Sequence, residues 1–148
     1  MFKALEGYQP QKVTDGFDII KENNMVAIVN SAMIEEYKGE KPDLKGVRFF
    51  RYELEIVKSM GAQGRKLWKS YRLDDEKSCR ALADMMFTLG LEFKDEESLT
   101  AAAEKFAAMN VKVKAWGWKP DDKEEARQMH MIKGEGSLED AADLKAPF

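Results

Sequence analysis

Tryptophan and lysine alternate with small residues along residues 111–119, Val-Lys-Val-Lys-Ala-Trp-Gly-Trp-Lys. Successive side chains of an extended strand point to opposite faces, so the small residues would share one face here. The opposite face would carry Lys112, Lys114, Trp116 and Trp118. Because indole rings stack on unpaired bases and ammonium groups neutralise phosphates, this pattern predicts a surface for single-stranded nucleic acid.

Two earlier segments repeat this chemistry. Residues 47–58 and 65–73 each alternate between an apolar face and a face with basic and aromatic side chains. Glu53 and Glu55 fall on the basic face of the first segment and count against a uniformly basic groove. The predicted DNA-binding residues of all three segments are Phe49, Arg51, Arg65, Lys66, Trp68, Arg72, Lys112, Lys114, Trp116 and Trp118.

A competing interpretation places the three tryptophans in the core, since tryptophan is buried on average in globular domains. Here they alternate in phase with lysine or arginine and out of phase with smaller aliphatic residues. This phase favours exposure of Trp68 and Trp116, whereas Trp118 is left open between the two interpretations. An exposed aromatic sheet would also suit a protein-interaction module, which is the alternative from another functional class.

Residues 134–148 form a second candidate interaction segment. They contain four acidic residues and one basic residue, and they end in Pro-Phe. An apolar side chain beside a terminal carboxylate fits a basic, hydrophobic pocket on a partner protein; an ordinary frayed end is the alternative. The predicted partner-binding residues are Glu139, Asp140, Asp143, Pro147 and Phe148.

The composition excludes several classes of protein. The chain has 148 residues, of which 44% are hydrophobic, and this fits one domain with a substantial core. No apolar run approaches the roughly 18 residues of a membrane span, and the N-terminus lacks the apolar region of a signal peptide. One cysteine and one histidine cannot form an internal disulfide or a Cys/His zinc site. We therefore expect a soluble cytoplasmic protein with no metal, cofactor or membrane partner.

Enzymatic interpretations find little support, and no catalytic residue is assigned. Residues 61–64 lack the glycine spacing of a phosphate-binding P-loop. A metal-dependent nuclease would need converging carboxylates, and Glu36 and Lys38 with Asp15 or Asp18 are the candidates. Their spacing is common by chance, so the sequence favours a binding protein without catalytic activity.

Charge is segregated along the sequence, although the whole chain has a net charge of −3. Residues 47–73 carry seven basic and two acidic residues, and residues 74–109 carry nine acidic and four basic ones. Residues 110–119 carry three lysines and no acidic residue. A basic surface, an acidic surface and an acidic tail are therefore expected on one molecule.

Periodicity and turn residues predict the elements that would position these side chains. Strands are expected at residues 25–34, 47–58, 65–73, 111–118 and 126–133. His130, in the last strand, is interpreted as structural. Helices are expected at residues 74–90 and 98–110, and a short element is indicated around residues 17–20. The expected domains are an N-terminal arm, a main domain and a tail, at residues 1–24, 25–133 and 134–148.

Five strands with helices between the third and fourth are the element order of the OB-fold, a partly open barrel that binds oligonucleotides. We therefore expect a mainly β fold with α-helices. It would be a five-stranded OB-fold barrel with a helical insertion between strands 3 and 4 and a flexible acidic C-terminal tail. A small α+β sheet with helices on one face would have the same order and is the alternative.

Several short segments carry a resemblance to a known family. They are Asp15-Gly16-Phe17-Asp18, Arg51-Tyr52-Glu53-Leu54-Glu55-Ile56-Val57, Gly64-Arg65-Lys66-Leu67-Trp68 with Leu73, Leu89-Gly90-Leu91 and Val111-Lys112-Val113-Lys114. In these the chain resembles the phage-encoded OB-fold single-stranded DNA-binding proteins of recombination and replication cassettes. It departs from that family at Asn23-Asn24 and in the short loop at residues 61–64.

The resemblance implies sequence-independent cover of single-stranded DNA during phage replication or recombination, in the cytoplasm of the bacterial host. The C-terminal segment is separately similar to the acidic, Phe-ending tails of bacterial and phage single-stranded DNA-binding proteins. It departs from them at Lys145. This similarity implies recruitment of a replication or recombination protein, and a homo-oligomer is kept as an open alternative.

Overall fold

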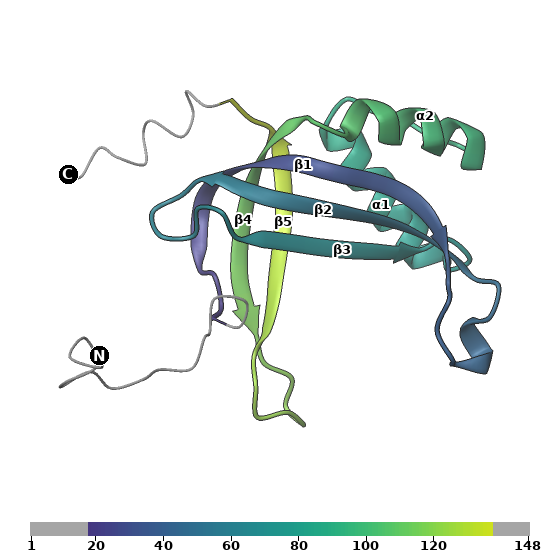
Figure 1. Cartoon of the computed structure of the whole chain (residues 1–148), viewed down its shortest axis with the longest axis horizontal. Coiled ribbons are helices and arrows are strands. Elements are labelled where there is room, and N and C mark those ends of the chain that lie inside the picture. The colour runs from purple at the N-terminus through teal and green to yellow at the C-terminus, as the bar shows by residue number, and fades with distance from the viewer. Residues whose placement is uncertain (1–17, 138–148) are drawn as a thin grey trace, which may run out of the picture.

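Five antiparallel strands and two helices make up residues 18–137, the part of the chain that this computed structural model describes (Figure 1). The elements are β1 (Glu22–Glu36), η2 (Pro42–Leu44), β2 (Arg48–Lys58), β3 (Lys66–Arg72), α1 (Glu76–Thr88), α2 (Glu96–Phe106), β4 (Asn110–Trp118) and β5 (Arg127–Glu135). The strands form one sheet in the order β3-β2-β1-β4-β5. The prediction of a mainly β fold with helices between the third and fourth strands is confirmed.

The long first strand bends the sheet. Residues 22–28 of β1 pair with β4, and residues 26–36 pair with β2. The pairing with β2 shifts register between Val26 and Ala27 and again between Val29 and Ser31. Because such bulges bend a strand, β1 can serve both halves of the sheet, and β4 and β5 run across the layer of β1, β2 and β3 in Figure 1.

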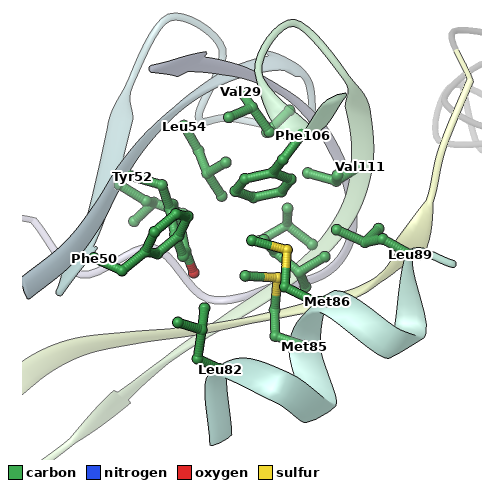
Figure 2. Close-up of a cluster of buried hydrophobic side chains, with 14 of the residues drawn as sticks. Val29, Phe50, Tyr52, Leu54, Leu82, Met85, Met86, Leu89, Phe106 and Val111 are labelled. Carbon is green, nitrogen blue, oxygen red and sulfur yellow. The ribbon is translucent and has the colours of Figure 1, made fainter. Parts of the chain in front are cut away.

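The core fills the inner side of this bent sheet (Figure 2). Along β2 the predicted alternation is confirmed: the fully buried residues are Phe50, Tyr52, Leu54 and Ile56. Phe106 of α2 packs between two of them, with ring centroids 6.5 Å from Phe50 and 5.5 Å from Tyr52. Helix α1 contributes Leu82, Met85 and Met86 to the same cluster.

Capping residues fix where the helices begin and end. The Asp75 carboxylate accepts the Ser78 N–H at 2.8 Å to start α1, and Gly90 follows its end at φ 75°, as the sequence predicts. The second helix begins two residues earlier than predicted, because Asp95 and Ser98 form a capping box. It also ends earlier than the predicted Asn110, with Ala108 in a left-handed conformation at φ 69°.

The ends of the sheet differ slightly from the predicted strand boundaries. The sheet begins at Glu22 rather than Met25 and ends at Glu135 rather than Lys133. The short element predicted around residues 17–20 does not form a helix or strand at residues 18–20, and residue 17 lies outside the described part. Within residues 18–137, no helix is both long and apolar enough to cross a bilayer.

Candidate nucleic-acid interface

The outer face of β1, β2 and β3 carries aligned rows of side chains. Cross-strand pairing defines three rows: Glu35, Phe49 and Arg72; Met33, Arg51 and Ser70; and Ser31, Glu53 and Trp68. Directly opposed residues have Cβ atoms about 5 Å apart, so the strands bring four predicted binding residues onto one surface. Trp68 is 51% exposed there, and Phe49 is half-buried.

The Glu53 carboxylate holds Trp68 in place. It accepts the Trp68 indole N–H at 3.0 Å and an amide N–H of Asn30 at 2.9 Å, and Lys66 Nζ lies 3.8 Å away. The hydrogen bond from Asn30 has the largest effect on the pKa of Glu53 and lowers it. Desolvation, second in size, raises this pKa, and the Trp68 hydrogen bond and the charges of Lys66 and Arg51 lower it further. Glu53 is therefore ionised near neutral pH, and it fixes the edge of the indole while leaving half of the side chain exposed.

On a face that bound DNA, Glu53 would have two opposed effects, because its charge would repel phosphates and its hydrogen bond would hold Trp68 in place. Glu53→Gln removes this negative charge but keeps an oxygen that can accept the Trp68 N–H. We expect this variant to bind oligo-dT about threefold more tightly at low salt, measured by fluorescence titration. Glu104→Gln, on the exposed side of α2, is the matched control for the charge change. Weaker binding by Glu53→Gln would show that the charge itself is needed.

A groove lies between the β1–β2 connection and the outer face of β2 and β3. Its volume is about 810 Å³. Tyr37 and Phe49 line it with ring centroids 6.4 Å apart, and Met33 and Arg51 line it as well. Tyr37 and Met33 were not among the residues predicted from the sequence to bind DNA, although they line this groove. The signal was present, because Met33 and Glu35 share the outward face of β1 and Tyr37, two residues further on, continues the same alternation.

The predicted face of β4 also points away from the core. Val111, Val113 and Ala115 are buried, at 0%, 0% and 2% exposure, so the alternation predicted for residues 111–118 is confirmed. Trp118, left open by the sequence, is 51% exposed. Trp116 is half-buried, with Lys114 Nζ 5.8 Å from its ring centroid in a cation–π contact.

The ten predicted residues thus fall into two groups rather than one continuous row. One group lies on β2 and β3 and the other on β4, with β1 between them at the bend of the sheet. A hollow of about 240 Å³ beside Trp68 leads toward β5 and is lined by Arg65, Lys66 and Gln128. The Gln128 side chain donates to the Trp116 carbonyl oxygen at 3.1 Å, so this hollow adjoins the backbone of the second group.

Acidic side chains neutralise part of the predicted basic surface. Arg72 forms an ion pair with Asp74, and the hydrogen bond between them is the main cause that raises the pKa of Arg72. Arg48 forms an ion pair with Glu96. By contrast, Arg51 has no ion pair within residues 18–137. A phosphate that contacted Arg72 would therefore compete with Asp74, whereas at Arg51 it would be opposed by the nearby charge of Glu53 without an ion pair to break.

Asp18 and Glu36, two residues of the nuclease alternative, do not meet. Asp18 precedes β1 and Glu36 ends it, so the fifteen-residue strand separates them, and Asp15 lies outside the described part. No group of three or more histidine, cysteine or carboxylate side chains within residues 18–137 is placed to hold a metal ion.

The predicted partner-binding residues, Glu139 to Phe148, also lie outside the described part. No family model matches this sequence, and no curated protein matches it either.

Proposed function

We propose that this protein binds single-stranded DNA without sequence specificity, using the outer faces of β2, β3 and β4. The observation that carries the proposal is the exposure of Trp68 and Trp118, each 51%, on the side of the sheet away from the core. Tryptophan is usually buried. Two half-exposed indoles beside lysine and arginine side chains are the combination that stacks bases and contacts phosphates.

We further propose that the bent sheet is a partly open barrel of the OB type. Helix α1 contacts both β3 and β5, the edge strands that closure would bring together. Across the interior, Tyr52 Oη of β2 lies 2.8 Å from His130 Nε2 of β5. OB-folds bind oligonucleotides on strands 2 and 3 and on the loops between strands 1 and 2 and strands 4 and 5. In such a barrel, Trp68 on β3, the groove beside the β1–β2 connection and Trp118 at the end of β4 would lie at the corresponding positions.

The family resemblance extends this proposal to a biological role. A phage single-stranded DNA-binding protein would cover DNA strands exposed during replication or recombination. Residues 137–148 would then recruit a replication or recombination protein, as the acidic tails of the proteins that this segment resembles do.

Titration with oligonucleotides tests the binding function. Oligo-dT should quench the tryptophan fluorescence, and log K should fall linearly with log salt, with a slope of about −0.7 for each phosphate contact. Duplex DNA of the same length should bind more weakly, because its bases are not free to stack. Absence of both quenching and salt dependence would instead favour the protein-interaction module, for which the exposed Met33 and Met131 are available.

A further inference from the structure

We propose that the groove beside the β1–β2 connection holds an unpaired base, and that Glu35 makes it favour bases carrying an amino group over thymine. This inference rests on the proposed function and refines it: binding needs no particular sequence, but one position of the bound strand has a modest preference among bases. The groove has aromatic walls in Tyr37 and Phe49 and a cation in Arg51. These groups suit a base that stacks and a phosphate that follows it.

Tyr37 is fixed in position before any ligand binds. Its hydroxyl oxygen accepts the backbone N–H of Lys41 at 3.2 Å. The chain at Gly39 lies directly against the ring: a Cβ atom there would be 2.2 Å from the Tyr37 hydroxyl oxygen and 2.4 Å from Cζ. A larger residue at this position would push the Tyr37 ring aside, so Gly39 lets the ring lie where it forms one wall of the groove. Because this ring is already in position, less conformational entropy is lost on binding, and this favours affinity.

The charges in the groove are of both signs. Glu35 and Glu36 line it together with Lys38 and Arg51. A phosphate backbone alone would call for cations, and carboxylates would repel it. A groove with acceptors and cations side by side matches a ligand that carries hydrogen-bond donors as well as a phosphate, which is the chemistry of a nucleotide with an amino-bearing base.

Glu35 is the carboxylate best placed to contact a base. It is the β1 partner of Phe49 in the sheet, so both side chains emerge from the same outer face as neighbours. A base stacked on Phe49 would present an edge toward Glu35. Cytosine and adenine offer an exocyclic amino group to a carboxylate, whereas thymine offers carbonyl acceptors at the same positions.

A comparison of two pyrimidine oligonucleotides tests this inference. We expect oligo-dC to bind the wild-type protein about 3- to 10-fold more tightly than oligo-dT of equal length, as one additional hydrogen bond would give. In Glu35→Gln the ratio should fall to about 1, because the amide can also donate to a thymine carbonyl. Glu40→Gln, an exposed residue of the same connection, removes the same charge and should keep the wild-type ratio.

A glycine pair tests the groove independently. Gly39→Ala should displace Tyr37 and reduce the dC/dT ratio, whereas Gly61→Ala should not, because a Cβ at Gly61 meets no atom within 4 Å. Thermal unfolding of each variant checks that it is folded. Binding of dC and dT with equal affinity, or an unchanged ratio in Glu35→Gln, would overturn the inference and leave the proposed function standing. No binding of either oligonucleotide would overturn both.

Discussion

Trp68→Ala should weaken binding of oligo-dT by about 5- to 150-fold without unfolding the protein. Removal of one stacking ring costs about 1–3 kcal/mol of binding free energy per base. Half of the Trp68 side chain is exposed, and its indole N–H is bonded to Glu53 on the surface. The ring therefore contributes little to the core, and the unfolding temperature should change by no more than about 4 °C.

The matched control for this variant is Phe87→Ala. Phe87 is 70% exposed on α1, away from the outer face of β2 and β3, so it is an exposed ring that the proposed interface does not use. Fluorescence anisotropy with a labelled oligo-dT measures both variants in parallel with circular dichroism melting. Equal loss of affinity in the two variants would refute a specific stacking role for Trp68. A Trp68→Ala protein that does not fold would show that the ring is structural.

Local pattern was sufficient to predict which side of each strand is buried. In β2 the large residues at even positions from Phe50 to Ile56 are buried, and Phe49, Arg51, Glu53 and Glu55 lie on the other face. The outward direction of Trp68 followed from the same alternation along β3. A shift of one residue would have put Lys66, Ser70 and Arg72 into the core. Asp75 and Gly90 marked the ends of α1 for equally local reasons.

The alternation of residue types along the sequence could not predict contacts between residues that are far apart in the chain. The bond of Asn30 to Glu53 depends on a bulge in β1, and the sequence gives no sign of where that bulge lies. Glu53 therefore appeared only as an acid within a basic strand, whereas it is the residue that orients Trp68. Likewise, the bend at β1 separates the tryptophans of β4 from Trp68, and periodicity within a strand contains no information on how the sheet curves.

Acidification should destabilise the fold through His130, by about 3 kcal/mol between pH 7 and pH 4. Burial, followed by the charge of Lys69, lowers the pKa of His130 from 6.5 to about 4. In the unfolded chain the imidazole takes up a proton below pH 6.5, whereas in the folded protein it stays neutral until about pH 4. The unfolded state binds more protons in this window, so the stabilisation present above pH 6.5 is lost as the pH falls.

His130 is the single histidine of the chain, which makes this effect separable from the titration of carboxylates. His130→Gln keeps a polar group that can hydrogen-bond the Tyr52 hydroxyl but does not titrate. Urea unfolding at several pH values should therefore give a shallower pH dependence for the variant between pH 6.5 and 4. Glu53, Asp74 and Asp95 have lowered pKa values in both proteins, and their contribution cancels in the comparison. Parallel stability curves, or an NMR titration of the folded imidazole near pH 6.5, would show that the imidazole is hydrated and that the contact between β2 and β5 is open to water.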